Sequence, residues 1–310
     1  ERIAGYRNFS TKIWNGCKFL EFNNCITELE KDLPTINLEV NRWIINLYNE
    51  LNSRVKTSIK NYKFNDAADA LYQFIWKDYC DWYIEFIKPI LINTNDLDTL
   101  NETKNVSINI MKNVLLMLHP IMPYVTEEIF ENLFKSSELA ILSPWPKTIK
   151  SKHTLENGID LSIQLISAIR SLRVEKNIPS KSKPSIILKN VDPEKKKIII
   201  ENKKLIINLA RLNDIKFSSD KVLNDKFIVT TVENITLMLP LEGLIDVNEE
   251  KNRLNKELTN INLEIDIINK RLNNPMFIEK APSNVINEVK TKQSIYTQRK
   301  FEIEKALLNI

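Results

Sequence analysis

The sequence predicts a mainly α-helical protein: a helical bundle, then a small α/β module, then an antiparallel coiled-coil hairpin. Only four glycines occur in 310 residues, which favours long helices over loop-rich folds. Apolar residues recur every three or four positions through most of the first 150 residues and again after Val247. We therefore expect four regions, which are a helical domain over 1–150, a connecting helix and linker over 151–184, the α/β module over 185–245 and the hairpin over 246–310.

Within the first region, helical periodicity predicts five helices, with Asn37 as a plausible N-cap of the second. Pro89, Pro120 and Pro123 are expected to end helices, because proline lacks a backbone N–H. The expected helices cover about 2–22, 38–62, 64–89, 98–119 and 124–134.

The third helix, "FNDAADALYQFIWKDYCDWYIEFIKP" at 64–89, carries aromatic residues on almost every side. Its polar residues form a single stripe, so the rest of its circumference must be covered by neighbouring helices. The aromatics are therefore interpreted as the core of a bundle and not as a platform for base stacking. The stripe consists of Asp66, Asp69, Gln73, Lys77, Asp81, Glu85 and Lys88.

The middle of the chain changes character after a helix expected over about 154–177. The end of that helix carries Arg170, Arg173 and Lys176 three residues apart, which predicts one basic edge. A strand at "SIILKN" follows, then one helix with Asp192 as its cap, running through "LARL". Three more strands are expected at "DIKFSS", "KFIVTTVE" and "ITLMLPL".

The last region shows heptad spacing, which is typical of a coiled coil. A short break separates two such runs, so we expect them to fold back as a protruding antiparallel arm. The first seam is Val247, Leu254, Leu258, Ile261, Ile265, Ile268 and Leu272, and the second, poorer one is Val285, Val289, Tyr296, Ile303 and Ile310. The other faces carry Lys251, Arg253, Lys256, Lys270, Arg271, Lys290, Lys292, Arg299 and Lys300, which suit either a solvated surface or RNA contacts.

Composition excludes several classes of function. The net charge of +4 permits a nucleic-acid partner without requiring one, and no apolar run is long enough to cross a membrane. Three cysteines without a CxxC pair predict buried free thiols in a reducing, cytoplasmic setting, with no zinc spacing among cysteines and histidines. His119 is expected to be structural. The glycines cannot form a phosphate cradle, and "SKSK" at 180–183 lacks the architecture of a nucleotide-binding loop, so no self-sufficient active site or cofactor site is predicted.

Several motifs together resemble the C-terminal region of bacterial valyl-tRNA synthetases, over essentially the whole chain. They are "GYRNFSTKIWNGCKFL", the aromatic helix, "LHPIMPYVTEEIF", "SPWP", "IRSLRVEKNIPSKSK", "LPLEGLID" and "KRLNNPMFIEKAPSNVINEVKTK", in this order. The first few are shared loosely with the isoleucyl, leucyl and methionyl enzymes, whereas the arm with "FIEKAP" at its turn is specific to the valyl family. The helix-like start at Glu1 also suggests a piece of a longer protein.

The resemblance implies a class I anticodon-binding domain, a linking α/β module and an arm that packs on the outer corner of tRNA. The intact enzyme would use ATP and Mg²⁺ to attach valine to tRNA(Val), as a cytoplasmic monomer. The HIGH and KMSKS motifs and an editing domain do not occur in this sequence, so the chain alone should be catalytically inactive.

Two sets of residues are then expected to contact RNA. Arg7, Asn15 and Lys18 share a polar face of the first helix and would contact the anticodon loop, while Phe9, Ile13, Phe19 and Leu20 would face the core. On the arm, Lys251, Arg253, Lys256, Lys270, Arg271 and Lys290 would contact phosphates without base specificity. For the first helix, a merely solvated face explains the pattern equally well.

Two alternatives remain open at the level of sequence. The chain could be a non-catalytic coiled-coil module that binds protein, in which case the seam from Leu254 to Leu272 would drive dimerisation. It could also be the equivalent region of an isoleucyl-tRNA synthetase. The absence of a terminal zinc-binding cysteine cluster argues against that reading.

Overall fold

The structure is a computed structural model that describes residues 2–26, 35–134, 139–150, 158–218, 227–240, 247–274 and 282–308. The chain divides into two units, which are described separately below. Unit 1 comprises Glu1–Arg170 and Val191–Ala210, and unit 2 comprises Ser171–Asn190 and Arg211–Ile310.

Unit 1 is helical, as the sequence predicts. Its bundle consists of α1 (Arg2–Phe22), α2 (Glu39–Lys60), α3 (Phe64–Gln73), a π-helix η1 (Phe74–Tyr83), α4 (Ile84–Asn93), α5 (Leu97–Leu118) and α6 (Pro123–Phe134), followed by a 3₁₀ turn η2 (Ala140–Leu142). The unit also holds most of α7 (Gly158–Glu175) and the short helices α8 (Pro193–Glu201) and α9 (Lys203–Ala210). The expectation of one helix over α8 and α9 is wrong, because Asn202 leaves the helical conformation and its amide bonds back to the carbonyl of Ile198.

The segments α3, η1 and α4 follow one another without a break and form the centre of the bundle. Most of their aromatic side chains are buried, including Phe74, Tyr79 and Tyr83, which confirms that they belong to the core. Phe64 and Tyr72 are exceptions, with 59% and 39% of their surface exposed. The π-helix places one more residue in each hydrogen-bonded turn than an α-helix does, which spreads side chains around the axis and explains the aromatics on almost every side.

The expectation that Pro89 ends this helix is wrong. Pro89 lies inside α4, on an exposed position, and the helix continues to Asn93. Ile84, Phe86 and Ile87 on the other face are buried, so packing against the bundle outweighs the lost hydrogen bond. Pro123, by contrast, is the first residue of α6, where proline is well tolerated.

The predicted N-cap of α2 is also wrong. The residue at that position is Leu38, which offers no side-chain hydrogen bond. Instead, Glu102 of α5 reaches across and its carboxylate accepts hydrogen bonds from the backbone N–H groups of Asn37 and Leu38, at 2.8 and 3.0 Å, and from the Asn41 amide at 2.8 Å. The start of α2 is therefore capped by a buried acid from another helix.

The sheet of unit 2 has four strands in the order β2-β1-β4-β3. They are β1 (Ile186–Lys189), β2 (Ile215–Phe217), β3 (Phe227–Val232) and β4 (Ile235–Pro240), each within a predicted strand. β1 pairs parallel with β2 and antiparallel with β4, and β3 and β4 form a hairpin. Glu233 and Asn234 in its two-residue turn both have positive φ, as a type I′ hairpin requires.

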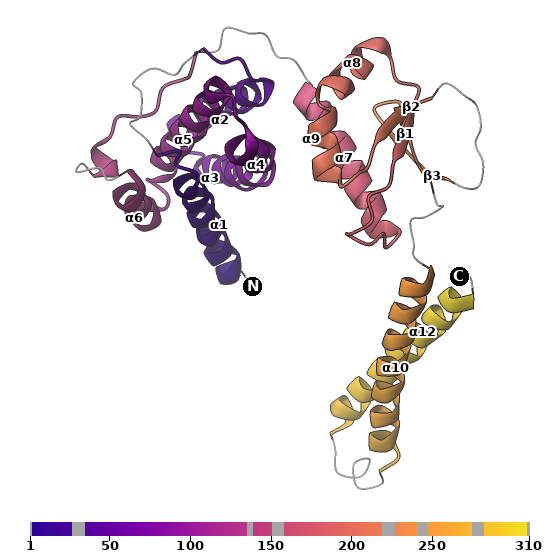
Figure 1. Cartoon of the computed structure of the whole chain (residues 1–310). Coiled ribbons are helices and arrows are strands. Elements are labelled where there is room, and N and C mark those ends of the chain that lie inside the picture. The colour runs from indigo at the N-terminus through magenta and orange to yellow at the C-terminus, as the bar shows by residue number, and fades with distance from the viewer. Residues whose placement is uncertain are drawn as a thin grey trace. The chain divides into compact units, whose positions relative to one another are not determined.

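The last two helices, α10 (Val247–Leu272) and α12 (Ser283–Leu308), lie side by side (Figure 1). Their buried contacts centre on Ile261 and Ile303, and the side chains of Leu258, Ile265, Tyr296 and Leu307 pack around them. Cross-helix bonds join Asn269 to Gln293 and Glu257 to Arg299, so the two helices run antiparallel, as predicted. Val247, Leu254 and Ile310 of the predicted seams lie outside the described side chains.

Candidate nucleic-acid interface

The first candidate surface is a face of α1. Phe9, Ile13, Cys17 and Leu20 recur at helical spacing and are buried, so they fix α1 against the bundle. Arg7, Asn15 and Lys18 are exposed, as the sequence predicts. The structure places Asn15 and Lys18 beside a common depression, whereas Arg7 lies more than two turns earlier on the helix.

A shallow depression of about 220 Å³ lies between α1 and the central helix. Gly16 allows the close approach of the two helices, because a Cβ there would lie 3.3 Å from the Cys80 sulfur and 3.7 Å from the Met111 methyl. The depression is lined by Lys12, Asn15, Gly16, Phe19, Cys80, Ile84 and Lys88. Its walls thus combine an amide, an aromatic ring and two ammonium groups.

A second, wider depression of about 590 Å³ shares Asn15 and Phe19 with the first and continues toward the end of α1. Phe22 contributes to it and is 87% exposed. Phe19 was expected in the core, but it is only half-buried, because its ring forms the wall between the two depressions. We call the two depressions together the α1 face.

Each lysine of the α1 face contacts both a carboxylate and an aromatic ring. Such exposed ion pairs contribute only about 0–1 kcal/mol, so a phosphate can replace the carboxylate at little cost. A nearby ring also attracts each ammonium group. Lys12 pairs with Asp81 over Trp76, Lys18 pairs with Glu21 over Trp14, and Lys88 pairs with Glu85 over Phe19.

Two side chains with reactive groups, Cys80 and His119, lie in structural environments. Burial, more than any neighbour, raises the pKa of the Cys80 thiol to about 12, so the sulfur stays protonated and is a poor nucleophile. His119 is buried, and its Nδ1 donates to Thr126 Oγ1 at 2.8 Å, because that hydroxyl itself donates to a backbone carbonyl. His119 is therefore a structural residue, and His153 lies outside the described residues.

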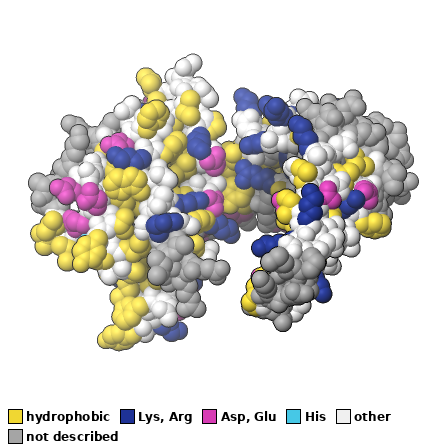
Figure 2. Space-filling view, turned by 90° about the horizontal axis from the view of Figure 1, so that it is seen from below, with side chains coloured by type: hydrophobic (Ala, Val, Ile, Leu, Met, Phe, Trp, Pro, Cys, Tyr) yellow, Lys and Arg dark blue, Asp and Glu magenta, His cyan; other side chains and the backbone are white. Residues whose placement is uncertain are grey.

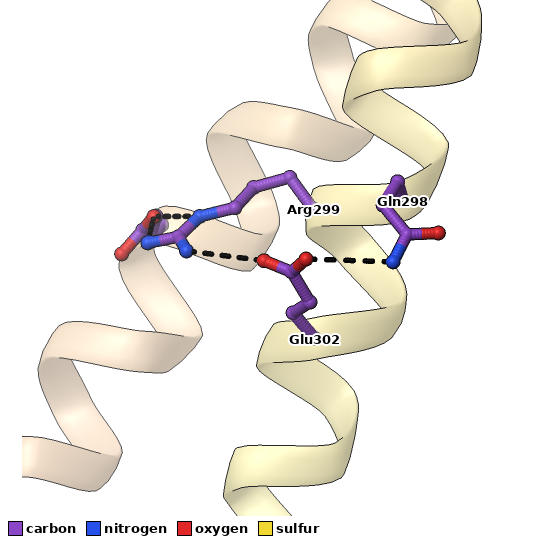
Figure 3. Close-up of polar contacts among 4 residues, drawn as sticks. Gln298, Arg299 and Glu302 are labelled. Carbon is purple, nitrogen blue, oxygen red and sulfur yellow. Dashed lines mark hydrogen bonds and ion pairs between the residues drawn. The ribbon is translucent and has the colours of Figure 1, made fainter.

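On the arm, some cations are already engaged in holding the two helices. Arg299 donates to Glu257 of α10 through Nε at 3.1 Å and Nη2 at 2.9 Å, and to Glu302 through Nη1 at 3.3 Å (Figure 3). Gln298 also bonds to Glu302. These carboxylates raise the pKa of Arg299. Because the guanidinium already binds Glu257 and Glu302, it stabilises the arm and is not available to an external anion. Lys300 likewise lies 3.8 Å from Glu304.

The remaining arm cations are placed differently. Lys256, Lys270 and Lys290 are exposed and have no carboxylate partner within the described part of the chain. Arg271 is exposed but already has an interaction, and the side chains of Lys251 and Arg253 lie outside the described residues. Three of the six predicted phosphate-contacting residues are therefore available for an anion.

The wider surface is mixed in charge. Figure 2 shows dark-blue Lys and Arg side chains over more of the displayed face than magenta acids, in keeping with the net charge of +4. Among the described residues, no group of His, Cys, Asp or Glu could hold a metal ion. No described helix has the length and apolar character needed to span a membrane.

Sequence reasoning missed part of the α1 face. Lys12, Lys88 and Phe22 were not predicted as site residues, although all three contribute to the depressions. Phe22 gave one usable signal, because it falls outside the buried stripe of α1 and so had to be exposed. Lys88 gave none, because its approach to α1 depends on how the helices pack.

Comparison with known families now identifies the class of protein. Residues 41–188 match the model described as the anticodon-binding domain of tRNA ligase. Residues 246–310 match the valyl tRNA synthetase tRNA binding arm. The chain therefore carries two domain types of the tRNA ligases, an anticodon-binding domain and a tRNA-binding arm. The match of the arm to the valyl model excludes the isoleucyl hypothesis.

Similar proteins specify the family. The chain is 36% identical to the valine–tRNA ligase of Zymomonas mobilis over 99% of its own length and 35% of that protein. It is 36% identical to the Bartonella quintana enzyme over 94% of the chain and 32% of that protein, and 33% identical to that of Carboxydothermus hydrogenoformans over 99% and 35%. The chain belongs to the valine–tRNA ligase family, and it spans about a third of the length of these curated relatives.

Proposed function

We propose that this chain supplies the tRNA-binding surfaces of an enzyme that attaches valine to tRNA(Val) with ATP and Mg²⁺. The α1 face contacts the anticodon loop, and the free lysines of the arm hold phosphates elsewhere on the same tRNA. Catalysis requires further domains of the kind that make up the rest of the relatives. We further propose that the complete enzyme acts as a monomer in the cytoplasm.

The observation that carries this proposal is the composition of the α1 face. Unpaired anticodon bases are read when they stack on flat side chains and form hydrogen bonds at their edges. Phe19 and Phe22 offer the flat surfaces, and Asn15 offers both a donor and an acceptor. Lys18 stands at the same depression, where it can meet a phosphate of the loop.

The contribution of the arm is of another kind. Lys256, Lys270 and Lys290 project from helix surfaces, with no aromatic ring in contact among the described residues. Such cations neutralise phosphates and make affinity depend on salt, but they carry no sequence information.

The test is fluorescence-anisotropy binding of the chain to a valine tRNA transcript and to the same transcript with its central anticodon base changed. Both are measured at two salt concentrations. We expect tight binding that the anticodon change weakens, with a steep salt dependence. Salt-dependent binding that ignores the anticodon would leave only the arm as an RNA contact and would remove the proposed role of the α1 face.

Single substitutions separate the contributions of Asn15 and Arg7 to tRNA binding. Asn15→Ala should weaken binding to the cognate transcript and reduce the difference between the two transcripts, because it removes a base-edge contact. Arg7→Ala should weaken both equally, because Arg7 lies outside the depressions and would meet only the backbone. Unchanged affinity in the Arg7 variant removes that residue from the interface. Dimerisation in ultracentrifugation without RNA affinity would instead support a protein-interaction module.

A further inference from the structure

Unit 2 contains a buried arginine without a carboxylate partner in the described part of the chain. Arg173 was expected on an exposed basic edge with Arg170, but only 7% of its surface is exposed. Its guanidinium donates through Nη2 to the carbonyls of Pro179 and Ser182, both at 2.8 Å, and through Nη1 to the carbonyl of Arg211 at 3.1 Å. We call this arrangement the Arg173 clamp.

The clamp joins two segments that are distant in the sequence. One is the turn that follows α7, which reverses at Asn177 with φ of 50° and closes through a bond from Ser182 N–H to Pro179 O. The other begins at Arg211, where φ is 55°. A further bond from Asn213 N–H to Pro184 O extends the contact to the start of the sheet. The turn is therefore held by the Arg173 guanidinium and, in addition, by main-chain bonds.

The consequence of the clamp is a concentration of positive charge. Lys181 and Lys183 flank Ser182, and Arg211 supplies the third carbonyl, so these side chains leave the backbone close to one guanidinium. All three are exposed, and none has an ion-pair partner among the residues that the structure describes. Burial first, and then the charge of Arg211, lower the pKa of Arg173, in keeping with this proximity.

No carboxylate among the residues that the structure describes forms an ion pair with these three cations. Glu175, near the end of α7, is instead paired with Lys176 at 2.8 Å. Gathering like charges is unfavourable in the free protein and becomes favourable only when an anion is bound. Two lysines separated by a single residue on a fixed turn suit successive phosphates of a backbone.

We propose that Lys181, Lys183 and Arg211 form a third RNA contact, which binds the phosphodiester backbone of the tRNA without regard to sequence, and that Arg173 is its positioning residue. The inference rests on the proposed function. The proposed contact differs from a nucleotide-binding loop. The turn between α7 and β1 binds phosphate through side-chain ammonium groups and not through the backbone of a glycine-rich loop.

The decisive variant is Lys181→Ala/Lys183→Ala, which leaves the clamp untouched. Its control is Lys147→Ala/Lys150→Ala, which removes two exposed lysines from a segment of unit 1 without helix or strand and changes the net charge equally. Affinity of the full chain for the valine transcript is measured across a series of salt concentrations. Two lost phosphate contacts should reduce the slope of log K against log salt by about 1.5 and weaken binding on the order of 30-fold at 0.1 M salt. The control should keep the slope of the unmodified chain.

The transcript with the changed anticodon base supplies the second comparison. The lysine variant should lose the same factor with both transcripts, since phosphate contacts carry no base information. Arg173→Lys, which keeps the charge but replaces the two bonding nitrogens of the guanidinium by a single ammonium group, should lose a similar factor while its far-UV circular dichroism stays unchanged.

Four outcomes would overturn the inference. An unchanged slope in the lysine variant, with tRNA still bound, refutes it and leaves the proposed function standing. An equal loss in the control variant shows a general effect of charge and refutes it as well. A loss confined to one transcript shows a base contact and not a backbone contact. If the unmodified chain does not bind tRNA at all, the proposed function fails together with the inference.

Discussion

The buried acid that caps α2 gives a quantitative prediction. Glu102 is 4% exposed, and Glu102→Ala leaves the N–H groups of Asn37 and Leu38 and the Asn41 amide without their acceptor. Hydrogen bonds to a charged group contribute about 1.5–3 kcal/mol each, so three would sum to roughly 4.5–9 kcal/mol. Asn37 is exposed and can bond to water instead, and removing a buried charge returns its own desolvation energy. We therefore expect a loss of about 3 kcal/mol in the free energy of unfolding.

The assay is urea unfolding followed by tryptophan fluorescence. All five tryptophans lie within Glu1–Arg170, so the signal reports on unit 1 alone. For a unit of this size, a loss of about 3 kcal/mol corresponds to a fall of roughly 6–12 °C in Tm. Glu102→Gln keeps the shape and one oxygen acceptor, and it should lose about half as much.

The control is Glu131→Ala, which removes an exposed acid from α6 and should change stability by less than about 0.5 kcal/mol. If Glu102→Ala proves as mild as this control, then water replaces all three bonds and the capping argument is wrong.

Two further predictions concern a buried acid and the arm. Burial first, with a smaller contribution from Asp160, raises the pKa of Asp78 from 3.8 to about 6, so the free energy of unfolding should fall as pH rises between those values. Asp78→Asn should therefore stabilise the protein by about 1 kcal/mol at pH 7.5 and not at pH 3.5. Urea titrations that give the same gain at both pH values would contradict this sign. Arg299→Met removes the bonds to Glu257 but keeps an apolar side chain, so it should destabilise α10 and α12 by about 0.5–1 kcal/mol. The measurement is hydrogen exchange, which should become faster in those two helices only. Exchange that matches the unmodified chain would show that the apolar seam alone holds the arm together.

Local patterns were sufficient to predict most elements of this fold. Three predictions that depend on neighbours in the sequence are confirmed: the buried positions Phe9, Ile13 and Leu20 of α1, the Asp192 cap of α8 and the heptad seam around Ile261. Phe19, predicted in the same stripe, is only half-buried. The errors at Asn37 and Pro89 have a different origin. In both cases a contact from another helix replaces the local rule, through Glu102 at the first and through burial of α4 at the second.

The candidate site was predicted only in part, for the same reason. Helical spacing identifies the exposed face with Asn15 and Lys18, because exposure follows from periodicity. Lys88 joins that face only because α1 packs along the central helix, and no pattern in the sequence records that packing. Arg173 shows the opposite failure, since its spacing placed it with the exposed Arg170 although it is buried.

The Arg173 clamp affects how the sequence of this turn can evolve. All three of its acceptors are main-chain carbonyls, which every amino acid supplies. The side chains at 181 and 183 can therefore be exchanged without disturbing where the turn lies, whereas position 211, with φ of 55°, favours residues that tolerate the left-handed region. One residue sets the place of the turn and others set its charge, so selection can adjust the strength of an electrostatic contact in single steps, without refolding the segment that presents it.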